Sequence, residues 1–195
     1  LELRLAEMRD PAKRQEAYNN LASSAASGYA VYGTAGGANG LTFNDGAVIF
    51  GNIRFVEGAD AITVNGADTL ISGQISFGAG NDQFTVTGGQ VIGNVFGGDG
   101  DDRFTVTGGE VNGWISGDGG TDTLTFGSAS AGYFGSLYGI QTIENIVFNG
   151  GSSVLFTGAS ATNFADGAIS INVTESQLGA GSVYTVISGK LAYGN

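Results

Sequence analysis

Short runs of alternating apolar and polar residues fill most of the chain after residue 28. In runs such as Phe104-Thr-Val106 and Leu124-Thr-Phe126, apolar side chains recur at every second position, and glycine clusters separate one run from the next. Alternation with a period of two is typical of β-strands that have one buried face. The pattern therefore predicts that residues 28 to 195 consist mainly of short strands joined by tight turns.

These runs repeat along the chain. The spans that align with one another are residues 51 to 71, 72 to 92, 93 to 112 and 113 to 128. Their apolar positions form three columns: Ile53, Ile75, Val95 and Ile115; Ile62, Phe84, Phe104 and Leu124; and Val64, Val86, Val106 and Phe126. A period of about 20 residues suits one coil of a β-solenoid, whose coils stack about 4.8 Å apart. We therefore predict an all-β fold, a right-handed parallel β-helix (β-solenoid) with these columns facing inward.

The two ends of the chain differ from this middle part. Residues 1 to 27 have a helical pattern, in which Asp10 followed by Pro11 is typical of a helix start. We predict a short α-helical cap here, because an open solenoid end exposes unpaired strand edges. Dimerisation through the same helices is the alternative. Over residues 129 to 195 the repeat loosens and its acidic loops disappear, so we predict wider coils of the same solenoid.

Composition restricts the possible chemistry. The chain has 195 residues and 36 glycines, but no cysteine and no histidine, so Ser–His and Cys–His nucleophile systems are excluded. After residue 28 the only bases are Arg54, Arg103 and Lys190, too few for an enzyme that must neutralise an acidic sugar. We therefore predict a protein that is not an enzyme. A polysaccharide-acting enzyme is the less favoured alternative, because paired carboxylates such as Asp99 and Asp102 are present.

Charge and hydropathy restrict the partners. The formal net charge is -11, which disfavours nucleic acid and anionic membranes as partners and favours cations. No run of about 18 apolar residues and no signal peptide is present, so we expect no membrane insertion by this segment. We expect it to be a mature or excised fragment. The lack of cysteine is compatible with export through an oxidising compartment.

An acidic loop motif recurs within the repeat. Residues 97 to 105 match the nine-residue calcium pattern G-G-x-G-x-D-x-U-x at every fixed position, and residues 77 to 85 and 117 to 125 match it in part. In this pattern carbonyl and carboxylate oxygens supply the six to eight ligands that calcium prefers. Four aspartates would then lie in a file about 4.8 Å apart, which repels itself unless a cation intervenes. They are Asp60, Asp82, Asp102 and Asp122.

The motif predicts calcium as a possible cofactor. The candidate ligands are Asn81, Asp82, Asp99, Asp102 and Asp122. The alternative is that glycine, aspartate and asparagine cluster here only because they form good turns.

Two resemblances follow from these motifs. Residues 78 to 125 resemble the RTX family of secreted calcium-binding proteins, although here one motif occurs per coil instead of one every nine residues. The coils of residues 51 to 128, with residues 139 to 158 and 176 to 189, resemble autotransporter passenger domains, which are β-helical adhesins and toxins. The membrane barrel of that family is absent from this sequence.

The second resemblance implies a location and a role. It implies a monomer at the bacterial cell surface or outside the cell, acting in adhesion to a protein or glycan of a host or neighbouring cell. The alternative is a structural stalk that spaces a distal functional domain from the surface. Trp114, which we expect to point outward, is either a platform for sugar stacking or incidental. Outward threonines such as Thr85 and Thr105 are expected to pack across strands, with an ice-binding face as the alternative.

Overall fold

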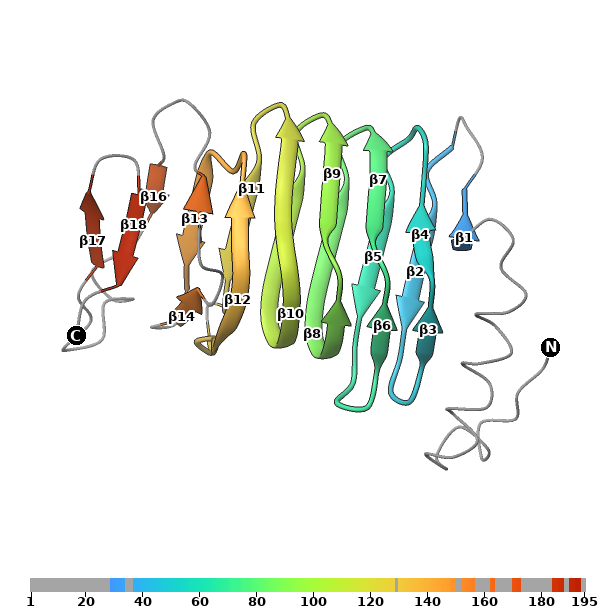
Figure 1. Cartoon of the computed structure of the whole chain (residues 1–195), viewed down its shortest axis with the longest axis horizontal. Coiled ribbons are helices and arrows are strands. Elements are labelled where there is room, and N and C mark those ends of the chain that lie inside the picture. Colours follow the sequence, from blue (N-terminus) through green and yellow to red (C-terminus); the bar gives the residue numbers. More distant parts are fainter. Residues whose placement is uncertain are drawn as a thin grey trace.

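The computed structural model describes residues 29–33, 37–128, 130–149, 152–156, 162–163, 170–172, 184–187 and 190–193. In this part of the chain the fold is an all-β parallel solenoid of about 5 turns (Figure 1). The prediction of a parallel β-solenoid is therefore confirmed. The helical cap predicted for residues 1 to 27 lies outside the described residues.

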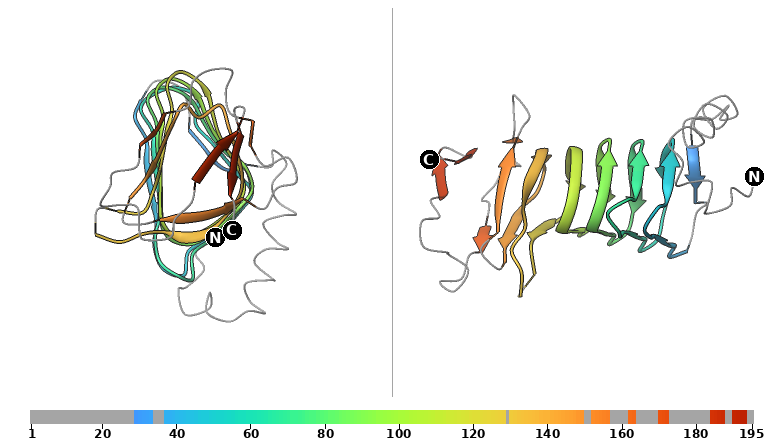
Figure 2. Two further views of the ribbon diagram at one scale, coloured as in Figure 1. Left: turned by 90° about the vertical axis from the view of Figure 1, so that its left-hand side faces the viewer. Right: turned by 90° about the horizontal axis from the view of Figure 1, so that it is seen from below.

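Each coil has three faces, which enclose a common interior when the solenoid is viewed end on (Figure 2). The first face contains β1 (Tyr29–Tyr32), β4 (Asn52–Arg54), β7 (Ile75–Ala79) and β9 (Val95–Asp99). The second contains β2 (Gly40–Phe43), β5 (Ala61–Val64), β11 (Thr123–Phe126), β13 (Asn145–Phe148) and β16 (Ser170–Asn172). The third contains β3 (Val48–Phe50), β6 (Leu70–Ser72) and β14 (Ser153–Phe156).

Three longer strands bend from one face to another. They are β8 (Gln83–Ile92), β10 (Arg103–Gly119) and β12 (Phe134–Gln141). β10 pairs along its length with strands of all three faces, including β11, β12 and β9. The short β15 (Thr162–Asn163) pairs with the end of β12. The chain therefore winds continuously, and its coils are held by main-chain hydrogen bonds on every side.

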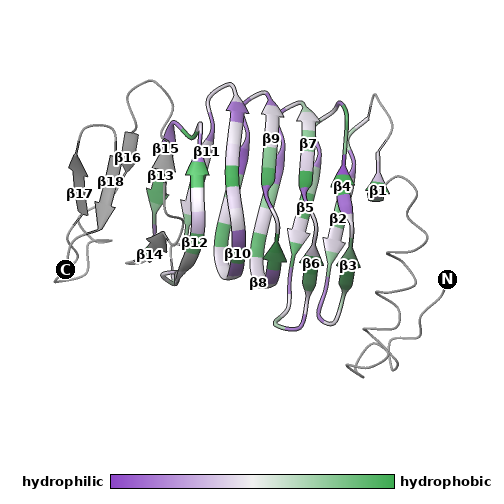
Figure 3. Ribbon diagram, in the orientation of Figure 1, coloured by the Kyte–Doolittle hydropathy of each residue, from purple (hydrophilic) through white to green (hydrophobic). Residues whose placement is uncertain are grey.

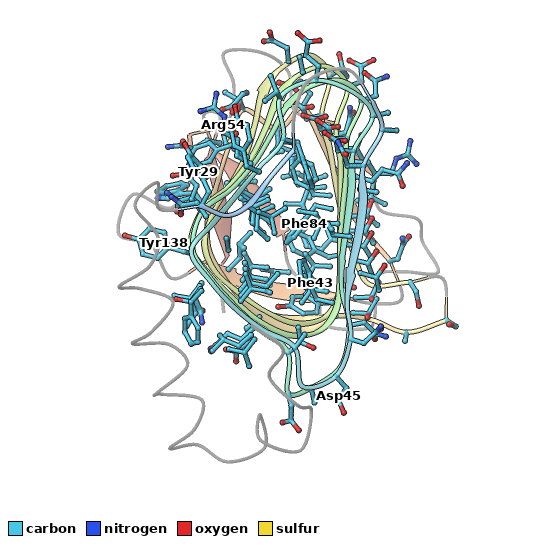
Figure 4. The ribbon with its side chains drawn as sticks, turned by 90° about the vertical axis from the view of Figure 1, so that its right-hand side faces the viewer. Tyr29, Phe43, Asp45, Arg54, Phe84 and Tyr138 are labelled. Atoms are coloured by element: carbon cyan, nitrogen blue, oxygen red, sulfur yellow. The ribbon has the colours of Figure 1, made fainter. Side chains whose placement is uncertain are left out.

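The register confirms the predicted columns. Ile75 pairs with both Ile53 and Val95, and Phe104 pairs with both Phe84 and Leu124. All the column residues are buried, and hydropathy alternates along the strands (Figure 3). Figure 4 shows Phe43 and Phe84 inside the coil. Like residues therefore stack coil upon coil, and this stack is the hydrophobic core.

Aromatic rings contact one another in this interior, both within a coil and between coils. The ring centroids of Phe77 and Phe84 lie 6.3 Å apart, and those of Phe126 and Phe148 lie 5.4 Å apart. Aromatic pairs at such distances contribute about 0.5 to 1.5 kcal/mol beyond the area that they bury. The core is therefore stabilised both within a coil and between coils.

The last two strands depart from the prediction. β17 (Tyr184–Ile187) and β18 (Lys190–Tyr193) pair antiparallel in a two-stranded sheet of their own. The expectation of parallel coils throughout residues 129 to 195 is therefore wrong at this hairpin, although β12 to β16 do continue the parallel pattern. The reason is the connection length, because a parallel crossover needs a dozen or more residues and only two separate these strands.

The second face is joined to each of the other two faces by a different kind of corner. The aspartate corner joins the first face to the second and consists of residues 57 to 60, 80 to 82, 100 to 102 and 120 to 122. The glycine corner joins the second face to the third and consists of residues 44 to 47, 65 to 69, 87 to 89 and 107 to 109. Among the described residues there is no helix with the length and hydropathy that a membrane crossing requires.

Candidate functional site: the aspartate ladder

The predicted file of aspartates exists, and it lies inside the solenoid. We call Asp60, Asp82, Asp102 and Asp122 the aspartate ladder. Each comes directly before a strand of the second face, or before the second-face part of a longer strand, and two residues before an inward apolar residue. Because strand side chains alternate, that spacing turns each carboxyl inward as well. All four residues are at most 2% exposed.

Each ladder carboxyl is bound to the backbone of the preceding coil. The N–H of Asp60 donates to Oδ1 of Asp82 at 2.7 Å, and the N–H of Asp82 donates to Oδ1 of Asp102 at 2.8 Å. The N–H of Asp102 in turn donates to Oδ1 of Asp122 at 2.8 Å. The side chains thus form a continuous hydrogen-bonded file along the solenoid axis.

Two further residues continue this file at its ends. The backbone N–H and the side-chain amide of Asn39 donate to Oδ1 of Asp60, at 2.6 and 2.8 Å. At the other end, the N–H of Asp122 donates to Oε2 of Glu144 at 2.7 Å. The acidic motif did not predict either residue, although each lies about one coil length from the nearest ladder aspartate.

The ladder replaces main-chain pairing where the backbone turns. The carbonyl of Asp82 accepts from the N–H of Arg103 at 2.9 Å, so the strand that comes next is paired in the usual way. The N–H of each ladder residue has a side-chain oxygen as its acceptor instead of a carbonyl. A buried N–H left without an acceptor would cost about 1 to 3 kcal/mol. Each ladder aspartate therefore secures the coil before it.

A second set of side chains secures the coil after it. On the exposed side of the corner, Oδ1 of Asn81 accepts the N–H of Asp101 at 3.0 Å, and Oδ1 of Asp101 accepts the N–H of Thr121 at 2.8 Å. Asp101 and Asp102 are sequence neighbours, yet the first binds the following coil and the second binds the preceding one. The corner is thus fixed in both directions along the axis.

The other oxygen of each ladder carboxyl is unpaired among the described residues. Oδ2 of all four aspartates is buried and makes no hydrogen bond within this part of the chain. A Cβ atom at Gly97 would overlap Oδ2 of Asp102, and one at Gly117 would overlap Oδ2 of Asp122. The first glycine of the acidic motif therefore makes room for the carboxyl of its own coil.

This environment changes the acidity of the ladder. Burial raises the pKa of Asp82 to about 6, that of Asp102 to about 7 and that of Asp122 to about 6. Hydrogen bonds from the backbone oppose these shifts, and nearby acids such as Glu144 add to them. Two charged carboxylates about 4.8 Å apart repel each other by about 3 kcal/mol at an effective dielectric constant of about 20.

The five predicted calcium ligands divide into two groups. Asp82, Asp102 and Asp122 lie in the buried ladder, whereas Asn81 in the aspartate corner and Asp99 at the end of β9 are exposed. One oxygen of each ladder carboxyl already accepts an N–H, and the other lies inside the coil. The described residues contain no group of three or more acids that could hold a metal. The ladder therefore does not fit a calcium shell, and calcium binding by the chain stays a prediction.

The outer surface carries a small aromatic cluster. The rings of Trp114 and Tyr138 meet edge to face with their centroids 5.5 Å apart, and Ile92 and Tyr138 are 42% and 43% exposed. Figure 4 shows Tyr138 outside the coil, and Trp114 is half-exposed, so its outward direction is confirmed. The backbone N–H of Trp114 donates to Oδ1 of Asn94 at 3.0 Å. We call Ile92, Trp114 and Tyr138 the aromatic patch.

The outward threonines also occupy the predicted positions. Thr85 pairs with Thr63 and with Thr105, and Thr105 pairs with Thr125. They form a column on the outside of the second face, and all four are half-buried.

Comparison with known proteins identifies no relative of this chain. No known protein family matches it, and no curated protein or solved structure matches it. Function is therefore inferred from the geometry of the chain itself.

Proposed function

We propose that this chain is a non-catalytic segment of an extracellular or cell-surface rod, similar to an autotransporter passenger domain, which binds another molecule through its outer face. The observation that carries the proposal is the aromatic patch, whose side chains lie outside a coil stack that already buries its apolar columns. Exposed tryptophan and tyrosine are enriched among the residues that dominate binding energy.

The charge of the molecule narrows the partner. With a net charge of -11, the rod repels anionic polymers, so a neutral glycan or a protein surface of low negative charge suits the patch best. The patch lies near amide side chains such as Asn94 and Asn112, which can hydrogen-bond to a polar ligand. Of the two partner classes we favour the glycan, because flat aromatic rings and amides complement sugar rings and their hydroxyls.

The position of the acids supports a non-catalytic role. A carboxyl pair that cleaves a glycosidic bond must reach the substrate from two sides. The ladder carboxyls are at most 2% exposed and bound to backbone N–H groups, so they serve the fold instead of a substrate.

A structural stalk is the second candidate. The observation that favours it is the aspartate corner, where hydrogen bonds join each coil to the coils before and after it. Such bonding suits a stiff rod that holds a distal domain at a fixed distance. In that case the aromatic patch would have no ligand.

Binding measurements on the whole chain test the proposal. We expect the labelled chain to bind a panel of neutral glycans or whole cells, and we expect Tyr138→Ala to weaken that binding at least tenfold. The matched control is Tyr32→Ala, since Tyr32 is also exposed (55%) but lies on β1, away from the patch. If the parent chain binds none of the probes, the adhesion proposal fails and the stalk remains.

A further inference from the structure

The aspartate ladder presents a charge problem that the proposed function does not use. Four carboxyls stand in one buried file, and the Oδ2 atom of each has no hydrogen-bond partner among the described residues. Their charged neighbours are the exposed Asp101 and Asp118 and the half-buried Glu144, all of which are acids. An ionised carboxylate buried without a cationic partner is strongly unfavourable, and such groups neutralise instead.

Two ligands could remove the charge, a metal cation or a proton. A cation needs several converging oxygens, but Oδ1 of each ladder residue from Asp82 to Asp122 is already bound to the N–H of the preceding coil. A proton needs only the free Oδ2 atom, and it adds no volume to an interior where Gly97 and Gly117 already lie against that atom. The neutral carboxylic acid keeps its second oxygen as the acceptor for the N–H.

We propose that the aspartate ladder is a proton-binding site, in which Asp82, Asp102 and Asp122 are held as neutral carboxylic acids in the folded solenoid. The protons come from solvent and bind to Oδ2 as the chain folds, with no other bond formed or broken. Asp102 holds its proton most tightly, because it is buried and has three acidic neighbours, Asp82, Asp122 and Asp118.

Protonation of the ladder gives the stability a definite dependence on pH. Burial raises the pKa of these groups to about 6 to 7 in the folded state, whereas an aspartate in the unfolded chain titrates near 3.9. Between these values the folded chain binds more protons than the unfolded chain, so stability falls as the pH rises from about 4 to about 7. The stabilisation that protonation of the ladder provides is complete below about pH 4. It is lost as the pH rises through the folded-state pKa values of about 6 to 7. It therefore makes the rod most stable in acid.

Surface charge also makes the stability depend on pH, because a chain of net charge -11 repels itself less when its exposed acids are protonated. Salt separates the two effects, because about 0.5 M salt screens exposed charges but acts much less on buried ones. The experiment is thermal unfolding of the whole chain in that salt, with a chelator present, from about pH 4 to about pH 8.

We expect the melting temperature of the parent to fall by roughly 5 to 10 °C over this range. Asp102→Asn removes the titrating group but keeps an oxygen for the N–H of Asp82, so its profile should be flatter and its stability at pH 8 no lower than that of the parent. Asp68→Asn is the control, because it removes the same formal charge from the exposed glycine corner, away from the ladder, and should follow the parent. If Asp102→Asn does not fold, the parent profile decides: a melting temperature that is constant or rises with pH in high salt overturns the proposal. A parent profile that Asp102→Asn reproduces also overturns it.

Discussion

The aspartate corner and the glycine corner belong to the same coils but obey different rules. At the aspartate corner every coil from residue 60 to residue 122 carries a buried aspartate that binds the backbone of the coil before it. At the glycine corner the turn has residues 65 to 69 in one coil and residues 87 to 89 in the next, and the registers on both sides still match. One corner therefore fixes the stacking, while the other absorbs changes in length.

The hydrogen bonds explain the difference. At the glycine corner, Oγ1 of Thr87 donates to Oδ1 of Asn65 at 2.9 Å on the exposed surface, where water can replace either partner. At the aspartate corner the bonds of the ladder are buried, so a lost partner is replaced by nothing. The exposed Thr87 contact between coils is therefore weaker than the buried contacts of the ladder.

Insertions should give the largest difference in unfolding free energy between the two corners. Two glycines inserted between Gly100 and Asp101 would displace the Asp102 carboxyl from the N–H of Asp82, and we expect a loss of on the order of 4 kcal/mol or more in unfolding free energy. The same insertion between Gly88 and Gly89 restores the turn length of the preceding coil, and we expect about 1 kcal/mol or less. Urea unfolding measures both. Equal losses would show that the corners do not differ.

Alanine substitutions of glycine should give the next largest effect. Gly100 has φ +129°, and a Cβ there would overlap the carbonyl oxygen of Gly80 in the preceding coil, so we expect Gly100→Ala to cost about 3 kcal/mol. Gly46 at the glycine corner has φ +82° with nothing within 4 Å of the added atom, so Gly46→Ala should cost only about 1 to 2 kcal/mol. Thermal and urea unfolding of the pair would contradict the comparison if Gly46→Ala were the more damaging change.

Calcium should have the smallest effect. At a free concentration ten times the dissociation constant, one weak site adds about 1.4 kcal/mol, which corresponds to a few degrees in melting temperature. Because the ladder oxygens are already engaged or enclosed, we expect any calcium response near pH 8 to be the same in the parent and in Asp102→Asn. A response of several degrees that Asp102→Asn abolishes would instead support the RTX-like calcium site.

Much of this fold could be predicted from the pattern of the chain. The spacing of Ile75, Val95 and Ile115 is enough to place them in one inward column, because coils of equal length stack in register. The file of aspartates follows from the same spacing. The pattern does not predict the hairpin of β17 and β18, because its strands alternate between apolar and polar residues in the same way as those of the coils. Only the short connection distinguishes them.

The acidic motif also does not indicate that the ladder side chains point into the solenoid, and this difference matters more for the site. The acidic motif suggests a cation site, but the motif alone does not take into account that side chains alternate between the two sides of a strand. Asp102, Phe104 and Val106 are two residues apart, so all three point to the same side of the strand, and the repeat already places Phe104 in the core. The unpaired Oδ2 atoms and the raised pKa values depend on the packing of neighbouring coils, which the sequence does not contain.

The protonation state of Asp102 tests the central claim most directly. In the whole chain labelled with ¹³C at the aspartate carboxyl carbon, NMR reports whether that carboxyl is neutral or charged, and Asp102→Asn assigns the signal. We expect the Asp102 signal to be that of a neutral acid at about pH 5 and to titrate with a pKa of about 7, as its burial requires. An Asp102 carboxyl that is fully charged at about pH 5 in the folded protein would contradict the account.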